Sequence, residues 1–476
     1  MPPPPLRTPS TTERRTGSSS SRKRKLEEEE EEEEEEDVVV VVVAHTPKTP
    51  SRGQYGCVYW PSLMLDAAGM LRTDPSDEAE EFVSKLQYDS TAARSEVTIG
   101  ALVAPLLATT TTKKKKKKEM PIMRFAPVLD AFAVKRAQVP EKVMRKCAVL
   151  AEGASPPPGS SENDFLVTKM HAAGRVTMDK HLREFGATHM QLLPIWNELM
   201  ISLDQLLSVG VVHRDLKSDN VMHGGTSSVV PFVPVVIDFG LAMHAPSLLD
   251  ERVSSEVAAE RWRDVFPALV TDYVVWCPEI TLCAALWQLS PLYDGDDLLF
   301  EASSASSDSS SASSDSSSSD GSMTEESYWR YHAQDGQPLP PEEVVDARTA
   351  RRLRAVVAAC FQKHPLLRAL AKRRPAEIAA KRRRLLALAS ACAGKSRLAA
   401  ARHVLRETWR DWDRFSLAGA FLRFRPGDDD EDMEAYTEEY QNDLALLDKK
   451  GATKDFKKLL RRTRAFWAEV DRLVLA

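Results

Sequence analysis

The stretch VVHRDLKSDNVMH, residues 211–223, decides how the rest of the chain is interpreted. It carries a carboxylate at Asp215, an ammonium at Lys217 and a side-chain amide at Asn220. The preceding segment, PIWNELMISLDQLLSVG, has apolar residues at helical spacing and ends at a glycine. This spacing predicts a helix that stops just before the stretch, so the three polar groups are expected on a loop at a helix end.

Two further motifs flank this loop. Downstream, VVPFVPVVIDFGLAM predicts a valine-rich strand that runs into Asp238-Phe239-Gly240, eighteen residues after Asn220. Upstream, SRGQYGCVY at 51–59 matches the pattern G-x-G-x-x-G-x-V in every place except the first, where Ser51 replaces glycine. Glycines in such a turn let the backbone approach a phosphate closely, and a carboxylate such as Asp238 can chelate Mg²⁺.

Taken in this order, the motifs resemble those of eukaryotic-type protein kinases. The variants FVSK, WCPE and WDRFSL are similar to sequences of the divergent kinases that large DNA viruses encode. The resemblance covers about 48–282 and 405–476. It implies an α+β fold of two lobes, with a small β-rich N-lobe and a larger helical C-lobe interrupted by low-complexity insertions.

The resemblance also implies a role for each motif residue in transfer of the ATP γ-phosphate to protein hydroxyls. Asp215 is expected to accept the proton of the substrate hydroxyl, with Lys217 near the transferred phosphate. Asn220 and Asp238 are expected to hold Mg²⁺. The lysine in DLKSDN is similar to that of the serine/threonine branch. ATP-binding residues implied by the resemblance are Ser51, Gly53, Gly56, Val58, Lys85 and Glu96.

Two lysines are candidates for the one that contacts the ATP phosphates. Lys135 lies in the familiar A-V-K setting, but no helix with a suitably spaced glutamate follows it before the next strand. Lys85 lies 29 residues after Gly56 and is followed by an amphipathic segment that contains Glu96. Because an ion pair with a glutamate holds this lysine on the phosphates, the sequence favours Lys85 over Lys135.

The segment VTDYVVWCPEITL resembles the end of a kinase activation segment. Cys277-Pro278-Glu279 stands where the family has Ala-Pro-Glu, so Glu279 is expected to form a buried ion pair with an arginine that the sequence does not identify. Thr271 is expected near the catalytic loop. Arg214 resembles the arginine of kinases in which a phosphate orders this segment, and the available hydroxyls are those of Ser247, Ser254, Ser255 and Thr271. A segment that is ordered without a phosphate is the alternative.

The family also has a buried aspartate that accepts hydrogen bonds from the catalytic-loop backbone. WDRFSLAGAFL offers Asp413 at the start of an apolar helix, whereas PLYDGDDLLFEA offers Asp294, Asp296 or Asp297. The serine-leucine pattern after Asp413 favours that residue. This choice makes 283–404 an insertion.

Composition predicts a disordered tail at 1–47. The resemblance implies an N-lobe at 48–170 and a C-lobe at 171–282 and 405–476, which leaves 283–404 as the insertion. Between Arg348 and Arg402 there are sixteen Lys and Arg residues against one acidic residue, Glu377. This pattern predicts one or two basic helices, interpreted as a solvated insertion. Nuclear import or nucleic-acid binding are the alternatives, although the stretch lacks the interleaved aromatics that stack on bases.

Charge and cysteine content limit the cellular context. The acidic run Glu27–Asp37 contributes −11 to a net charge of −6, so net charge says little about partners. Six cysteines without a C-x-x-C pair argue against a zinc site or a disulfide framework, which favours a reducing compartment. The apolar run Val38–Val43 is too short to span a membrane. An intracellular protein is expected, in the nucleus or cytoplasm, and in a host cell if it is viral. Arg22–Lys25 is a nuclear import signal or a solvated charge run.

The sequence therefore predicts a serine/threonine protein kinase that uses ATP and Mg²⁺ and acts on protein substrates. The alternative is a pseudokinase scaffold that binds protein partners. A nuclear nucleic-acid-binding protein built around the basic stretch is a third hypothesis, which would make the motifs incidental.

Overall fold

The computed structural model describes residues 39–41, 56–76, 81–108, 123–145, 147, 150, 163–174, 176–187, 189–224, 232–266, 269–288, 340–425 and 456–476. All of these belong to one unit, Val38–Ala476. The rest of the predicted tail, Ser51, Gly53, Asp294, Asp296, Asp297 and the Ser/Asp tract lie outside the described residues.

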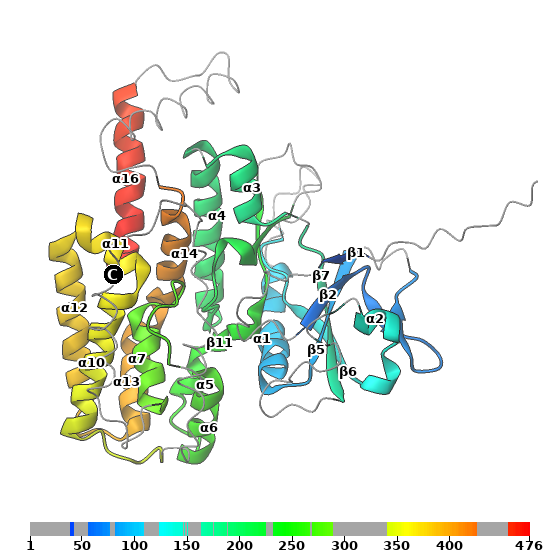
Figure 1. Ribbon diagram of the computed structural model, residues 1–476, viewed down its shortest axis with the longest axis horizontal. Coiled ribbons are helices and arrows are strands. Elements are labelled where there is room, and N and C mark those ends of the chain that lie inside the picture. The colour runs from blue at the N-terminus through cyan, green and yellow to red at the C-terminus, as the bar shows by residue number, and fades with distance from the viewer. Residues whose placement is uncertain are drawn as a thin grey trace, which may run out of the picture. The chain divides into compact units, whose positions relative to one another are not determined.

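An antiparallel sheet of five strands, in the order β1-β2-β5-β7-β6, forms the β-rich part of this unit (Figure 1). Its strands are β1 Val39–Val41, β2 Gly56–Trp60, β5 Phe82–Tyr88, β6 Val128–Lys135 and β7 Asp164–His171. A separate hairpin joins β3 Leu63–Leu65 to β4 Leu71–Thr73. The predicted disorder at 1–47 is wrong for β1, because the valine run, which favours extended structure, pairs with Val58–Trp60.

Helix α1, Thr91–Ala108, lies against the sheet through a glycine. A Cβ atom on Gly100 would come within 2.4 Å of the carbonyl oxygen of Val128 on β6, so only glycine permits this approach. Glu96 lies one helical turn before Gly100 and therefore shares its face of the helix. The close packing at Gly100 thus carries Glu96 toward the sheet.

Two cysteines pair in this region, contrary to the sequence prediction. Cys57 on β2 forms a disulfide with Cys147, 90 residues away, while Cys277, Cys283, Cys360 and Cys392 are free and buried. The hydroxyl of Tyr59 donates to the carbonyl of Val143 at 2.9 Å and holds the same two segments together. The pairing arises from tertiary packing, so spacing along the chain gives no sign of it.

Helices account for most of the other described residues of the unit (Figure 1). They are α2 Glu141–Arg145, α3 Met178–Phe185, α4 His189–Ser208, α5 Ala245–Leu249, α6 Ser255–Val265, α7 Pro278–Gln288, α10 Ala347–Lys363, α11 Pro365–Arg373, α12 Pro375–Ser390, α13 Arg397–Thr408, α14 Trp412–Leu422 and α16 Phe456–Leu475. Two short strand pairs lie among them, β8 Val211–Val212 with β11 Met243–His244, and β9 Val221–His223 with β10 Pro234–Val236. The predicted helix before the HRDLKSDN loop and the predicted strand before Asp238 are therefore α4 and β10.

The basic helices belong to the main hydrophobic core. Residues 278–287 of α7 are all buried, and α10 and α13 pack against this helix. The apolar faces of α10 to α13 join the same core as α7 and α14, through Leu353, Val357, Cys360, Leu367, Leu370, Leu385, Val404 and Leu405 among others. The prediction of a solvated insertion is wrong for these helices and for 283–288, which complete α7. The dense charge of the stretch obscures an apolar stripe that is typical of a core-facing helix.

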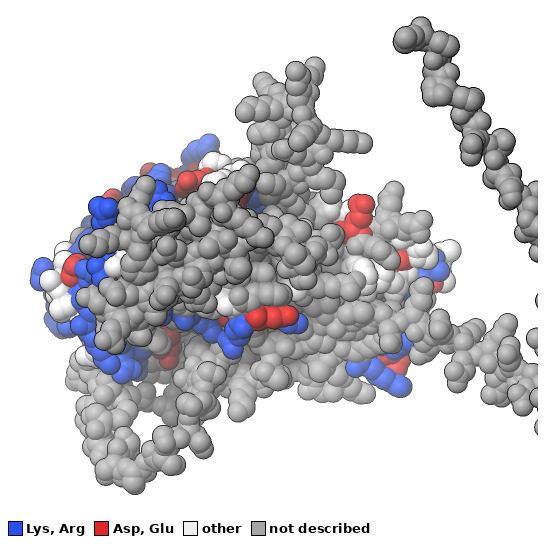
Figure 2. Space-filling model, turned by 90° about the horizontal axis from the view of Figure 1, so that it is seen from above, with Lys and Arg blue, Asp and Glu red and all other residues white. Residues whose placement is uncertain are grey.

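The charged faces of the same helices point to solvent. Arg351, Arg354, Arg368, Lys372, Arg382 and Arg383 are exposed. Figure 2 shows Lys and Arg side chains gathered on the side of the molecule where Figure 1 has α10 and α12. The fold is thus a mixed α+β fold with a small antiparallel sheet, as predicted at that level. Within the described ranges, no helix combines the length and apolar character that crossing a bilayer requires.

Candidate active site

Lys85, in the middle of β5, makes two ion pairs. Its Nζ lies 3.1 Å from Oε2 of Glu96 on α1 and 3.1 Å from Oδ1 of Asp238. The lysine is 7% exposed. Burial alone would lower the pKa of Lys85, but the charges of Asp238 and Glu96 outweigh it and raise this pKa, so the ammonium stays protonated. The predicted pairing of Lys85 with Glu96 is confirmed.

The other candidate lysine lies outside this cluster. Lys135 is the last residue of β6, and its side chain is 69% exposed. Its ammonium pairs with the carboxylate of Asp164, the residue opposite it on β7.

Gln87 is a member of the cluster that sequence reasoning missed. Its Nε2 donates to Oε2 of Glu96 at 3.2 Å. Lys85 and Gln87 are two residues apart on a strand, so their side chains share one face of the sheet. This spacing is the signal that could have identified Gln87.

The HRDLKSDN loop, residues 213–220, brings two polar side chains to the carboxylate of Asp215. Nδ2 of Asn220 donates to Oδ2 and to the backbone carbonyl of Asp215, both at 2.8 Å. Nζ of Lys217 lies 3.2 Å from the same Oδ2. The Asp215 carboxylate, 6% exposed, is therefore held in a fixed orientation, as a group that takes a proton from a substrate must be.

Asp238 lies beside this loop. The N–H of Ile237 donates to the carbonyl of Asn220 at 3.0 Å, which places the next residue, Asp238, next to Asn220. Asp238 has a φ of 59°, in the left-handed region that Asp tolerates better than most residues. Burial raises the pKa of Asp238, but the charge and hydrogen bond of Lys85, together with the charge of Lys217, lower it by more in sum, so the net shift is downward and the carboxylate stays ionised.

Asn220 and Asp238 are chemically suited to Mg²⁺. Among the described residues, no cluster of three or more His, Cys, Asp or Glu side chains forms a complete metal site. However, Mg²⁺ commonly binds one or two protein oxygen ligands together with substrate phosphates. The Asp238 carboxylate and the side-chain oxygen of Asn220 fit that description. The two hydrogen bonds that Asn220 makes to Asp215 use its Nδ2, not this oxygen.

The loop itself is held from below by Asp413 at the start of α14. Its two carboxylate oxygens accept the backbone N–H groups of His213 and Arg214, at 2.6 and 2.8 Å. Arg214 has a φ of 65°, an unfavourable conformation for a residue with a side chain, and this double contact helps to hold it there. The prediction that Asp413 accepts hydrogen bonds from this loop is confirmed.

A tyrosine outside the loop also contacts the carboxylate of Asp215. Oη of Tyr273 donates to Oδ1 of Asp215 at 2.5 Å. Thr271 is the hydroxyl expected near this loop from the sequence, but the hydroxyl that bonds Asp215 is that of Tyr273, two residues later. A tyrosine in a loop gives no sequence signal of such a contact.

Arg214 does not present its guanidinium to the hydroxyls predicted to carry a phosphate. The group is buried over the rings of Phe266 and Trp276, at 4.7 and 5.3 Å, and Nη1 donates to the carbonyl of Val265 at 2.8 Å. Burial lowers the pKa of Arg214 to about 10. Aromatic packing therefore occupies this side chain, and ordering of the activation segment by a phosphate stays a prediction, beside the alternative of a segment that is ordered without one.

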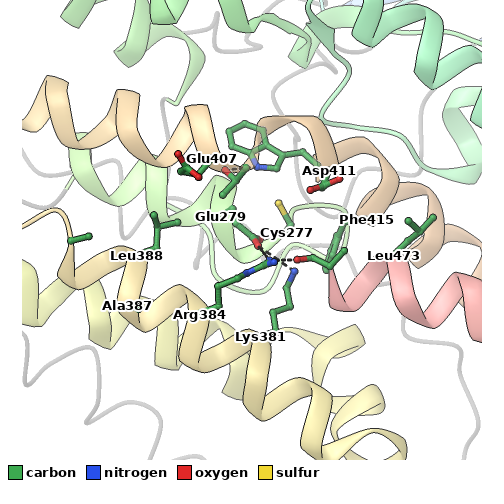
Figure 3. A pocket seen from close by; sticks show the side chains of 14 residues that line it. Cys277, Glu279, Lys381, Arg384, Ala387, Leu388, Glu407, Asp411, Phe415 and Leu473 are labelled. Atoms are coloured by element: carbon green, nitrogen blue, oxygen red, sulfur yellow. Dashed lines mark hydrogen bonds and ion pairs between the residues drawn. The ribbon is translucent and has the colours of Figure 1, made fainter.

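Glu279 forms its buried ion pair with the basic helices. Its Oε1 lies 3.2 Å from Nζ of Lys381 and 3.4 Å from Nη2 of Arg384, both on α12 (Figure 3). The two basic side chains extend toward Glu279 along the wall of a cavity of about 440 Å³. The expected partner was an arginine; the buried partner is Lys381, 102 residues away in the KRRR run.

We expect the stability of the protein to fall in acid partly because of Glu279. Burial raises the pKa of Glu279, but Lys381 and Arg384 lower it below its usual 4.5 in the folded state. A depressed pKa contributes stability that is complete above about 4.5 and is lost as the pH falls through the folded-state value. Urea unfolding measured from neutral pH to pH 3 checks this. Glu279→Gln should flatten the acid limb, and an unchanged limb would contradict the assignment.

Of the glycine-rich motif at 51–59, only residues 56–59 belong to the described part of the structure. Ser51 and Gly53 lie outside the described residues, whereas Gly56 and Val58 begin β2. Val58 is paired with Lys85 across the two strands, so it lies beside the ion-pair cluster. A Cβ atom on Gly56 would come within 2.5 Å of the carbonyl oxygen of Leu86 and of Cβ of Gln87. Gly56 therefore also permits close pairing of β2 with β5.

Comparison with known protein families and curated proteins identified no relative of this chain. No protein-family model matches the chain, and no curated protein does either. Function is accordingly inferred from the geometry of the site.

Proposed function

We propose that this protein is an ATP- and Mg²⁺-dependent serine/threonine protein kinase with the two-lobed fold of that family. The observation that carries the proposal is the position of Lys85, 3.1 Å from both Glu96 and Asp238. In protein kinases a strand lysine must pair with a helix glutamate, and the metal-binding aspartate must be in place beside them, for transfer to occur. Here one ammonium joins a strand, a helix and the loop after β10.

The remaining parts support the same reaction. Asp215 takes the proton of the acceptor hydroxyl, and Lys217 beside it offsets the negative charge of the transferred group. Mg²⁺, when bound with ATP, would neutralise the phosphate oxygens, and Asn220 and Asp238 are the residues suited to hold it. The sheet with Lys85 corresponds to the small lobe, and the helices around Asp215 correspond to the large one.

The proposal is tested by transfer of labelled γ-phosphate to a generic basic protein, with two matched lysine variants. We expect Lys85→Met to lower the rate about 10²- to 10³-fold, because a preorganised cation is lost from the phosphate site. We expect Lys135→Met to retain most of the activity, because its side chain is exposed and pairs outside the cluster.

Two results would count against the proposal. If Lys135→Met abolished transfer and Lys85→Met did not, the assignment of the site would be wrong. If the wild-type protein bound Mg-ATP but transferred no phosphate to any protein, a pseudokinase scaffold would be the better description. Thermal unfolding of both variants shows whether a loss of activity is a loss of folding.

A further inference from the structure

The hydroxyl of Tyr273 lies where an acceptor must lie for Asp215 to act on it. It donates to Oδ1 of Asp215 at 2.5 Å, while Oδ2 is engaged by Asn220 and Lys217. A general base acts on a hydroxyl within hydrogen-bond reach, which this distance satisfies. Burial and the negative charge of Asp215 raise the pKa of Tyr273, so the phenol keeps its proton until a base removes it.

The surrounding segment holds this hydroxyl in place. The ring of Tyr273 packs edge-on against Trp276, with centroids 5.6 Å apart. Nε1 of Trp276 donates to the carbonyl of Arg214 at 2.9 Å, and the N–H of Trp276 bonds the carbonyl of Tyr273. The tyrosine is thereby tied to the residue that precedes Asp215 in the loop.

We propose that Tyr273 is a site of phosphorylation by the same chain, an inference that rests on the proposed kinase activity. In this step the phenolic proton passes to Oδ1 of Asp215, and a bond forms between Oη and the γ-phosphorus of ATP. The bond between that phosphorus and the β,γ-bridging oxygen breaks, and ADP leaves with its electron pair. An acceptor already held beside the base reacts as if at very high concentration, so a tyrosine can be modified by an enzyme otherwise specific for serine and threonine.

The modification would open the site for other acceptors. A phosphotyrosine carries a charge of about −1.5 to −2 at neutral pH, and like-charge repulsion from Asp215 disfavours its remaining there. Departure of the side chain leaves Oδ1 of Asp215 free for a substrate hydroxyl. Transfer to an added protein should therefore show a lag that prior incubation with Mg-ATP removes.

The test uses the full chain, first treated with phosphatase and then incubated with Mg-ATP at several protein concentrations. Mass spectrometry should find phosphate on Tyr273 with a first-order rate that does not depend on protein concentration. Tyr273→Phe should lose this phosphate and, at whatever rate it labels the added protein, should show no lag, and Asp215→Asn should lose the phosphate as well.

Different failures separate this inference from the proposed function. Labelling of the added protein with Tyr273 unmodified would overturn the inference and leave the kinase proposal standing. A rate proportional to protein concentration would overturn modification within one chain. Loss of all transfer in Tyr273→Phe, with wild-type Tyr273 unmodified, would show that the phenol only positions Asp215. No transfer to any acceptor would overturn both proposals.

Discussion

Asp215→Asn lowers kcat for phosphoryl transfer by about 10²- to 10⁴-fold, the range that loss of a general base typically produces. The amide keeps the size and shape of the carboxylate, so the loop should retain its fold. It cannot take the proton of an acceptor hydroxyl, which is the role that the contacts of Asp215 with Asn220, Lys217 and Tyr273 support. Binding of Mg-ATP should change little, because the cluster around Lys85 is untouched.

Asp219 provides a matched control within the same loop. It is an aspartate four residues after Asp215, and it lines a surface hollow with Thr177, Lys180 and Arg183. Asp219→Asn should therefore retain most of the activity, measured as initial rates at saturating ATP. Equal losses in the two variants would mean that the loop tolerates no amide substitution, and the assignment of Asp215 as the base would fail.

Lys381→Met destabilises the fold by about 3–5 kcal/mol, as removal of one partner from a buried ion pair generally does. The side chains of Lys381 and Glu279 are 2% and 5% exposed, so the carboxylate left behind cannot be solvated by water. Arg384 remains at 3.4 Å, but it is 57% exposed and compensates only in part. Urea unfolding at neutral pH measures the change.

Two variants control this measurement. Arg382 follows Lys381 on α12 but is exposed, so Arg382→Met should leave stability within about 0.5 kcal/mol of wild type. Removing both charges, with Glu279→Gln and Lys381→Met together, should cost less than Lys381→Met alone, because no charge is then left unpaired. A double variant less stable than the single one would contradict the ion-pair explanation.

Contacts close in sequence were predictable. Asp215, Lys217 and Asn220 lie within one loop, so their types and spacing indicate their chemistry. The choice of Lys85 over Lys135 depended on a glutamate at the right distance in a helical segment, and the structure pairs Lys85 with Glu96. Asp413 was identifiable despite its distance because the apolar helix after it carries a recognisable pattern.

Contacts that depend on tertiary packing alone were not predictable. Lys381 is one of sixteen basic residues in its stretch, and only burial against Glu279 distinguishes it. The Cys57–Cys147 disulfide and the Tyr273 contact likewise join residues that no local pattern relates. The basic helices were predicted to be solvated for a related reason. Their many charges hide the pattern of apolar residues at helical spacing, which face the core in the folded protein.

The contact between Asp413 and the HRDLKSDN loop has a consequence for synthesis of the chain. The side chains that would handle phosphate, from Lys85 to Asp238, leave the ribosome well before Asp413. This residue, whose carboxylate accepts the N–H groups of His213 and Arg214, lies about 200 residues after them in the chain. Until α14 emerges, these two groups lack their acceptor, and Arg214 lacks that support for its left-handed backbone. A nascent chain is therefore expected to complete its loop only after the basic helices have been made, so that the proposed activity arises only once α14 is available.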